Sequence, residues 1–520
     1  MLDPIKRRRF VLAIIQCFLL GAALTTGIDE KRSFAAMNAP EIARPGLEWF
    51  NVAGPLPIAS LRGRIVILDF WTEGCINCIQ IIPTLRRVEE RFPDKVVVIG
   101  VHSPKFANEK NAASVKDAIR RYDIRHPVIH DPQMTIWRAY GVQAWPTLVV
   151  VGADGNVAGS VSGEPDPDRF VAAIEKLVET SSMAGTLKPA ALDLALLPEP
   201  KGRFLFPGKL KSVPGHDKRW VLADGGHNQM VLLDDNGKEL ERYGSGETGL
   251  LDGAKDKARF NHPQGVIASS DAIFVADTES HAIRRIDLAS GAVTTLAGTG
   301  KRGMQLGAPE PGRTRALASP WDLEKKGDKL FFANAGTHQI GVLDLKSGTV
   351  ATLAGTGEEG LRDGRAASAS LAQPSGLALS ADGKTLYVAD SESSAVRAIT
   401  LSDNPQIRTL VGAGLFDFGW INGDFRNARL QHPLGVAVDG DLLLVADTYN
   451  SAIRELELAK HEVADFDGGK FTCVDPVCVP TREPAGIVVD APDRILLVDT
   501  GNHRIDEYRP SAKTYHTWSR

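Results

Sequence analysis

This sequence has few cysteines and no excess of basic residues, and each of these two features argues against one class of function. Five cysteines occur in 520 residues, and Cys75 and Cys78 form the sole C-x-x-C spacing. A structural zinc site usually needs a second such pair or histidines at matching spacing. The 60 Lys and Arg residues are outnumbered by 64 Asp and Glu, a formal net charge of -4, whereas nucleic-acid binders usually carry a basic field. We therefore predict no metal, no cofactor and no nucleic-acid partner.

Glycine and proline, in contrast, are plentiful. Fifty glycines and thirty prolines stand in a chain that is 43% hydrophobic. Such a composition indicates many turns around apolar cores rather than disorder. The length is sufficient for two or three domains.

The N-terminal residues resemble an export signal. Basic residues 6–9 precede an apolar run over residues 10–27, which is long enough to cross a bilayer. Residues 7–12 also resemble the twin-arginine export pattern, and Cys17 lacks the small preceding residue of a lipoprotein cysteine. We expect residues 1–38 to be an export signal or membrane anchor, which would place the protein in the periplasm or anchored facing it. A start at Met37 would instead give a cytoplasmic protein.

The most informative stretch is residues 65–83. The apolar residues 65–68 predict a strand buried on both faces, and the apolar periodicity after Cys78 predicts a helix. Cys75 then lies at the helix N-terminus, where unpaired N–H groups stabilise a thiolate, so we expect its pKa to fall below that of free cysteine. Cys78, one turn further on, is placed to close a disulfide with Cys75.

This stretch resembles the strand–CxxC–helix of the thioredoxin family. Asp69 matches the family's buried carboxylate, Pro83 its helix-kinking proline, and residues 145–147 the cis-proline loop. The resemblance implies that Cys75 attacks, Cys78 resolves, Asp69 shuttles a proton and Pro146 shapes the substrate groove. It implies protein disulfides or dithiols as substrates.

Several departures keep other functions open. Gly74 stands where thioredoxins place Trp, and the charge of Glu73 is expected to raise the pKa of Cys75. Thr72 and Cys75 match the Thr-x-x-Cys fragment of the peroxiredoxins, although Leu68 replaces that family's proline. The alternatives are a thiol peroxidase and a thioredoxin-like fold with merely structural cysteines.

Residues 39–180 are expected to form this first domain, an α/β sandwich about one sheet. Strands are expected near 96–101, 148–151 and 157–161, and helices at 112–122 and 166–179. Residues 181–202 are expected to be a linker, with a helical turn at 190–197.

Internal repeats dominate residues 203–520. A strand ending in Asp or Asn recurs six times at intervals of 52 to 57 residues, at Asp224, Asp277, Asn334, Asp390, Asp447 and Asp499. From the second repeat onward Pro-x-Gly or a variant precedes each strand. Four short strands per repeat, six times, predict a six-bladed β-propeller, and the motifs resemble NHL repeats. Loops 249–263, 360–374 and 419–433 are expected to gather at one rim and form a binding surface.

Two further sets of residues invite a chemical interpretation. His281, His338 and His503 recur at one position of the blades, where Ser394 and Ser451 stand in two others. Periodic residues of propellers mostly bridge blades by hydrogen bonds, which we favour over a metal site. Cys473 and Cys478 are expected to form a structural disulfide in an oxidising compartment, or to remain two free thiols.

A wider resemblance is carried by the order of the two domains and by residues 46–49, 75–78, 100–103, 145–147, 206–209, 336–339 and 390–394. Over nearly the whole chain after residue 40, the sequence resembles the NHL-repeat-containing protein 2 family. The family implies architecture rather than chemistry. The leading hypothesis is a thiol–disulfide oxidoreductase whose propeller docks a protein partner, and the alternatives are a non-enzymatic interaction scaffold and the peroxidase.

Overall fold

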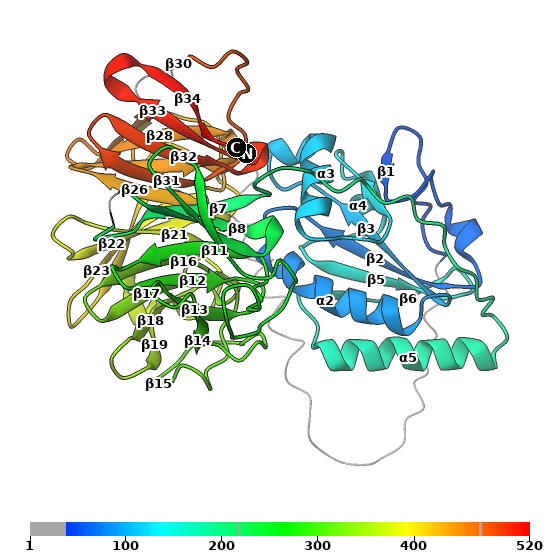
Figure 1. Ribbon diagram of the computed structural model, residues 1–520. Helices are drawn as coiled ribbons and strands as arrows, with labels where there is room; N and C mark the ends of the chain where they lie inside the picture. The colour runs from blue at the N-terminus through cyan, green and yellow to red at the C-terminus, as the bar shows by residue number, and fades with distance from the viewer. Residues whose placement is uncertain (1–37, 217, 467–470) are drawn as a thin grey trace. The chain divides into compact units, whose positions relative to one another are not determined.

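The computed structural model describes residues 38–216, 218–466 and 471–520 (Figure 1). The predicted export signal or anchor, with Cys17 and Met37, lies outside the described residues. Within the described ranges, no helix combines the length and apolarity needed to cross a membrane. Residues 39–520 belong to one contiguous unit.

The first part of this unit is built on a six-stranded mixed sheet. Its central strand β2 (Ile65–Trp71) pairs parallel with β3 (Val96–His102) and antiparallel with β5 (Thr147–Val151). Every residue of β2 is buried, as expected for an apolar run in the middle of a covered sheet. The sheet order is β1-β4-β3-β2-β5-β6, with the outer strands β1 (Glu48–Phe50), β4 (Val128–His130) and β6 (Val157–Ser162).

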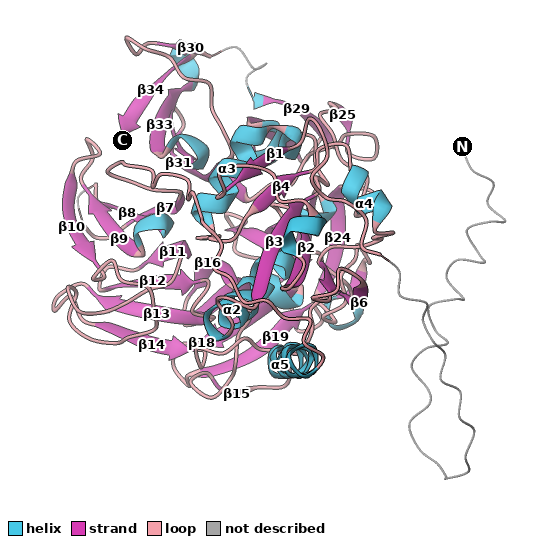
Figure 2. Ribbon diagram, turned by 90° about the vertical axis from the view of Figure 1, so that its right-hand side faces the viewer, coloured by secondary structure: helices cyan, strands magenta, loops and turns pink. Residues whose placement is uncertain are grey.

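Helices cover both faces of this sheet, so the predicted α/β sandwich is confirmed. On one face α2 (Ile76–Arg91) and α5 (Pro167–Met183) pack side by side against Ile65 and Ile67 (Figure 2). The opposite face of β2 packs against α4 (Thr135–Ala139). A fourth helix, α3 (Ala112–Arg121), contributes to a smaller core around the two cysteines. Alternate residues of β2 thus point to opposite cores, as the two-residue period of a strand requires.

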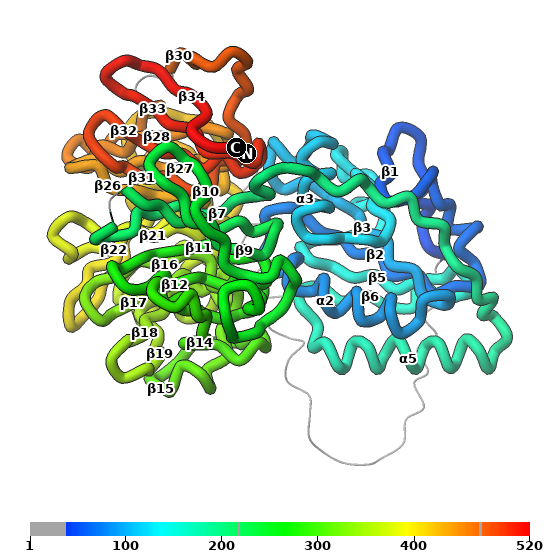
Figure 3. The backbone as a smooth tube through the Cα atoms, in the orientation of Figure 1, coloured from blue at the N-terminus to red at the C-terminus, as the bar shows by residue number. Residues whose placement is uncertain are grey.

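The connector between the two parts is extended, and the helical turn predicted at residues 190–197 is wrong. Figure 3 shows it leaving α5 and passing α3 on its way to the propeller. Ala195 bridges to Asn51, and the backbone N–H of Leu197 donates to the Asn51 side chain at 3.1 Å. Backbone pairing with the first domain therefore outweighs the helix propensity of this alanine- and leucine-rich segment.

The second part consists of six sheets, antiparallel except for one short edge strand of the last, which confirms the six-bladed propeller. The innermost strands β7, β11, β16, β21, β26 and β31 contact one another in a closed ring. The first three blades comprise β7–β10 (Pro207–Ser212, Trp220–Asp224, Gln229–Leu233, Glu239–Tyr243), β11–β14 (Pro263–Ala268, Ala272–Asp277, Ala282–Asp287, Val293–Ala297) and β15–β19 (Glu310–Pro311, Pro320–Lys326, Lys329–Asn334, Gln339–Asp344, Thr349–Ala354). The last three comprise β20–β24 (Gly364–Arg365, Pro374–Leu379, Thr385–Asp390, Ala395–Thr400, Gln406–Val411), β25–β29 (Gly423–Asp424, Gly435–Asp439, Leu442–Asp447, Ala452–Glu457, Glu462–Asp465) and β30–β34 (Thr472–Cys473, Pro484–Ala491, Arg494–Asp499, Arg504–Arg509, Thr514–Ser519).

The repeated aspartates hold each blade together internally. Each is fully buried, and one carboxylate oxygen accepts a backbone N–H from the segment that enters the blade, as Asp277 does from Asn261 at 2.7 Å. The other oxygen pairs with an arginine, as Asp277 does with Arg284 at 2.7 Å. The same arrangement holds for the pairs Asp224–Arg242, Asp390–Arg397, Asp447–Arg454 and Asp499–Arg504. Because these carboxylates are committed to blade structure, they are not free for chemistry.

The repeated histidines form hydrogen bonds between neighbouring blades, which confirms the role predicted for them. His281 Nδ1 accepts the backbone N–H of Ser319 at 3.0 Å, and His338 Nδ1 accepts that of Gln373 at 3.1 Å. His503 accepts the N–H of Phe206 and so helps to close the ring between the last and first blades. Asn228, Ser394 and Ser451 make the equivalent bond at the other three junctions, through a side-chain oxygen.

Candidate redox site

Cys75 caps the N-terminus of α2. The turn after β2 brings its sulfur over the first helical turn, where it accepts the backbone N–H of Cys78 at 3.2 Å. Cys78 lies on that first turn, and the two thiols are not bonded to each other in this structure. The chain thus places two sulfurs three residues apart at a helix start, the arrangement needed for one attacking and one resolving thiol.

Both thiols are deeply buried, and this reverses the acidity predicted for Cys75. Cys75 is 6% exposed and Cys78 is 2% exposed. Burial raises the pKa of Cys75, and the hydrogen bond from Cys78 opposes that rise without cancelling it. The prediction of an unusually acidic Cys75 is therefore wrong, because loss of solvation outweighs the helix N-terminus. Burial likewise raises the pKa of Cys78.

Asp69 lies behind the cysteines on β2. It is 3% exposed, and within the described part of the chain its Oδ1 has no hydrogen-bond partner. Burial raises the pKa of Asp69 to about 7. Its negative charge in turn contributes to the raised pKa of Cys78, so the two groups are electrostatically linked. A carboxyl that titrates near neutrality beside a resolving thiol is suited to accept and return a proton.

Pro146 lies in a loop that faces the cysteines. The Trp145–Pro146 peptide bond is cis, and the indole N–H of Trp145 donates to the Ser103 carbonyl at 2.9 Å. Gln143 and Ala144 of this loop line a cavity that also includes Cys75. The structure therefore brings this loop, the attacking thiol and Asp69 into one region.

Glu73 and Thr72 have structural partners. The Glu73 carboxylate is fully buried and lies 3.4 Å from the guanidinium of Arg121. The charges that help to raise the pKa of Cys75 come instead from Glu392 and Glu359 of the propeller. The Thr72 hydroxyl donates to the buried carboxylate of Glu109 at 2.5 Å.

The propeller presents a ring of six side chains at one rim, and this ring was missed from the sequence. Its members stand directly before the first residue of each innermost strand or its Pro-x-Gly motif and share a positive φ of 46° to 58°: Phe206, His262, Ser319, Gln373, His432 and Glu483. The blade-bridging residues described above hold the backbone N–H of each one. Five of the six contact the thioredoxin-like domain, so we call them the rim residues.

Gln373 makes the most direct contact with the redox site. Its amide nitrogen donates to the Gly74 carbonyl at 2.8 Å, and its amide oxygen accepts the backbone N–H of Ile76 at 2.9 Å. These two bonds fall on the residues immediately before and after Cys75. One propeller side chain thereby clasps the active-site turn, and we call this contact the Gln373 clasp.

Buried ion pairs surround the clasp. Lys105 pairs with Glu392 at 2.5 Å, and Arg121 pairs with the rim residue Glu483 at 2.5 Å. The four side chains are between 4% and 11% exposed. Gly336 shows how close the approach is, since a Cβ on it would overlap the side chain of Gln80 on α2. Two of the three loops predicted to form a binding surface, 360–374 and 419–433, contact the chain's own first domain through Gln373 and His432.

A cavity of about 130 Å³ remains between the two domains at Cys75. Trp145 and the neighbouring residues of the cis-proline loop form one wall, and the propeller residues His338, Glu359 and Glu392 form another. Phe416 of the loop after β24 also lines it and is 71% exposed. The cavity therefore connects the attacking thiol to the molecular surface.

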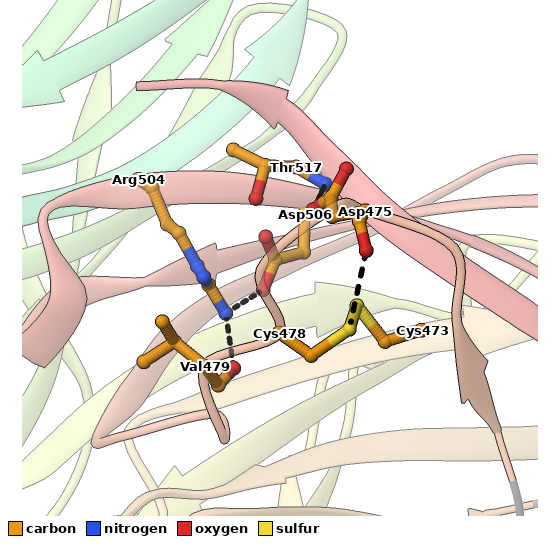
Figure 4. The surroundings of a disulfide bond; sticks show 7 residues. All are labelled: Cys473, Asp475, Cys478, Val479, Arg504, Asp506 and Thr517. Carbon is orange, nitrogen blue, oxygen red and sulfur yellow. Dashed lines mark hydrogen bonds and ion pairs between the residues drawn. A yellow bond between two sulfur atoms is a disulfide. The ribbon is translucent and has the colours of Figure 1, made fainter.

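The second cysteine pair has very different surroundings. Cys473 and Cys478 are joined by a disulfide bond in a surface loop of the last blade, with Cα atoms 6.0 Å apart (Figure 4). Between them, Asp475 accepts the backbone N–H of Thr517 at 2.7 Å, which ties the loop to β34. Among the described residues, no group of three or more His, Cys, Asp or Glu side chains is arranged to hold a metal ion.

Comparison with known proteins agrees with this architecture. A thioredoxin-like family model matches residues 63–157, and an NHL-repeat model matches residues 430–456. NHL repeat-containing protein 2 of Gallus gallus is 37% identical over 513 residues, which cover 90% of this chain and 70% of the relative. Protein SUPPRESSOR OF QUENCHING 1, chloroplastic, of Arabidopsis thaliana is 38% identical over 504 residues, covering 92% of this chain and 47% of the relative.

The first domain alone has further relatives. Thiol-disulfide oxidoreductase ResA of Bacillus cereus is 24% identical over 171 residues, which cover 32% of this chain and 94% of the relative. The thioredoxin-like domain is thus related to thiol–disulfide oxidoreductases, and the rest of the chain is an NHL propeller. Thioredoxin-like domains and propellers are both domain types that commonly bind protein partners.

Proposed function

The chain belongs to the NHL repeat-containing protein 2 family, and within that architecture we propose that its thioredoxin-like domain carries out thiol–disulfide exchange through Cys75 and Cys78. The observation that supports this most is the position of Cys75. Its sulfur caps α2, receives the Cys78 N–H at 3.2 Å and lines a cavity with the cis-proline loop.

The reaction follows from the two sulfurs. The Cys75 thiolate attacks one sulfur of a disulfide R–S–S–R, which forms a Cys75–S–S–R mixed disulfide and releases one thiolate. The Cys78 thiolate then attacks the Cys75 sulfur, closes the Cys75–Cys78 bond and releases the second thiolate. Two electrons pass from the dithiol to the substrate, and Asp69 takes the proton of Cys78. The reverse sequence oxidises a dithiol.

The test is mixed-disulfide trapping in the full chain. With Cys78 replaced by Ser, resolution is blocked, so a disulfide substrate remains attached to Cys75. With Cys17 replaced by Ser in both proteins, we expect one equivalent of adduct on the Cys78→Ser variant and none on the Cys75→Ser/Cys78→Ser variant, measured by intact mass. The proposal would be overturned if the folded Cys78→Ser variant formed no adduct under conditions in which the same variant, unfolded in denaturant, does form one.

A second candidate function is a non-enzymatic interaction scaffold. The burial of Cys75 and the Gln373 clasp favour it, because both limit access to the thiol. Full complementation of a deletion strain by a Cys75→Ser/Cys78→Ser variant would support the scaffold. The peroxidase interpretation gains nothing comparable, since the Thr72 hydroxyl donates to Glu109; hydroperoxide consumption with a thiol donor tests it.

We also propose export from the cytoplasm. The basic residues 7–9 followed by an apolar run support it, as does the Cys473–Cys478 bond, because disulfides persist in oxidising compartments. Mass spectrometry of the mature N-terminus from fractionated cells tests this. A protein that begins at Met37 in the cytoplasmic fraction would contradict it.

A further inference from the structure

We propose that the Cys75 site exchanges with low-molecular-weight disulfides of neutral or positive charge, and that the propeller rim excludes disulfides of folded proteins. This inference rests on the thiol–disulfide exchange proposed above and names its substrate class. It is carried by what surrounds Cys75 on the propeller side.

The backbone beside Cys75 is not available to an incoming chain. A protein substrate would need to lie along the active-site turn, but the Gly74 carbonyl and the Ile76 N–H are both bonded to Gln373. His432 and Tyr449 close the same surface, because a Cβ on Gly74 would lie 2.9 Å from the His432 ring and 3.1 Å from the Tyr449 hydroxyl. The rim thus occupies the space that a substrate polypeptide would fill.

Two buried ion pairs join the rim to the first domain. Lys105 and Glu392 are 5% and 9% exposed, and Arg121 and Glu483 are 11% and 4% exposed. Parting the two domains would hydrate these side chains, but it would break both ion pairs and both hydrogen bonds of the Gln373 clasp together. Protein disulfides would therefore have to displace a well-anchored cover, whereas a small molecule enters the existing cavity.

The cavity fits a small molecule. Its volume of about 130 Å³ corresponds to roughly four water molecules, enough for one short arm of an aliphatic disulfide. Cys75 stands at one wall and the exposed ring of Phe416 at another. One arm can enter while the leaving thiol stays in solvent.

The charge of the lining favours cationic over anionic substrates. Glu359 and Glu392 both line the cavity, and Lys105 is the single lysine or arginine among its lining residues within the described chain. Lys105 is already paired with Glu392 at 2.5 Å. Glu359 is thus the group without a cationic partner in the cavity, and although burial raises its pKa to about 7, it is mostly ionised at pH 8 and would repel an anionic arm.

Single-turnover oxidation of the reduced full chain at pH 8 tests the inference. The probes are cystamine (cationic), bis(2-hydroxyethyl) disulfide (neutral), 3,3′-dithiodipropionate (anionic) and insulin, and each rate is divided by the rate of that probe with dithiothreitol. Peptide mass spectrometry measures closure of the Cys75–Cys78 bond. We expect the normalised rate with cystamine to be about tenfold higher than that with dithiodipropionate. It should be about a hundredfold higher than the rate with insulin.

Two variants assign the selectivity to named residues. Glu359→Gln is expected to reduce the charge preference to about threefold or less, while the neighbouring Glu358→Gln, whose side chain does not line the cavity, keeps it. Gln373→Ala is expected to raise the insulin rate by about tenfold, since it frees the backbone beside Cys75. The exposed Gln406→Ala serves as its control.

The outcomes separate the two claims. This inference is overturned if the normalised rate with insulin equals that with cystamine, or if the anionic probe reacts faster than the cationic one. Either result leaves the exchange reaction itself standing. Failure of every probe to close the Cys75–Cys78 bond, while dithiothreitol reacts normally, overturns the exchange reaction itself.

Discussion

The two cysteine pairs of this protein differ in almost every physical respect. Cys75 and Cys78 are buried, unbonded and placed at a helix N-terminus beside Asp69. Cys473 and Cys478 lie in a surface loop and are bonded to each other. Sequence spacing alone does not explain the difference, because both pairs are short enough to close a ring. The surroundings decide it, since the first pair has a helix start, a proton acceptor and a cavity, and the second has none of these.

Burial gives the first pair selectivity rather than intrinsic speed. Its thiols have raised pKa values, so fewer thiolates are present at neutral pH than in free cysteine. A covered thiol reacts with what fits its cavity, whereas an exposed thiolate reacts with any oxidant.

The largest expected effect comes from the attacking sulfur. Cys75→Ser should lower the rate of disulfide exchange by about 10³-fold or more, because a serine hydroxyl cannot replace the thiolate nucleophile. Serine is a good helix cap, so α2 should remain intact. The matched control is Cys473→Ser/Cys478→Ser, which should exchange at the wild-type rate in the same assay. Equal losses in both variants would remove the functional distinction between the pairs.

Loosening the cover should have the next largest effect. Arg121→Ala leaves Glu73 and Glu483 buried without their shared cation, which should lower the free energy of unfolding by about 3–5 kcal/mol. Chemical denaturation measures this, and alkylation of Cys75 in native conditions should quicken. Arg87, whose partner Asp168 is largely exposed, is the control, and Arg87→Ala should cost less than about 1 kcal/mol. Equal costs would show that the interface is not anchored by buried charge.

Asp69 should reveal itself through pH. Its pKa is raised from 3.8 to about 7 in the folded chain, so folding favours the protonated carboxyl. The wild type therefore loses stability as the pH rises from about 4 to about 7, and it loses no more from this group at higher pH. Asn at position 69 does not titrate. The free energy of unfolding of Asp69→Asn should therefore rise, relative to that of the wild type, by on the order of 4 kcal/mol between about pH 4 and pH 8. Denaturant titrations at several pH values measure this difference. A difference that stays constant with pH would contradict a buried, titrating Asp69.

The smallest effect should come from the structural bond. Its loop is short, so the chain-entropy model gives a loss of about 2 kcal/mol when Cys473 and Cys478 are both replaced by Ser. Denaturation in the absence of reductant measures it. A larger loss, together with reduced exchange at Cys75, would indicate that this loop supports the redox site.

The fold and the site differ in how far the sequence could predict them. The apolar strand before Cys75 and the six recurring strands each carry a local pattern, so the sandwich and the propeller were predicted. The blade-bridging role of His281 and its equivalents also followed from periodicity. The helical turn at residues 190–197 was wrong, because Asn51 offers that segment a backbone partner that no local pattern records.

The rim residues were missed from the sequence, because five different residue types occupy the six positions. Their positions are periodic, but Phe206, Ser319 and Gln373 share no side-chain type. The raised pKa of Cys75 escaped for the same reason, because its cover comes from residues about 300 positions further along the chain. The signal that would have found them is the proline that directly follows each of the six.

The most direct measurement of the central claim is peptide mass spectrometry of the full chain after reaction with a small neutral disulfide. The reduced protein should acquire one new bond, between Cys75 and Cys78, and keep the Cys473–Cys478 bond through mild prior reduction. Cys75 and Cys78 that remain as thiols after prolonged exposure would contradict the account.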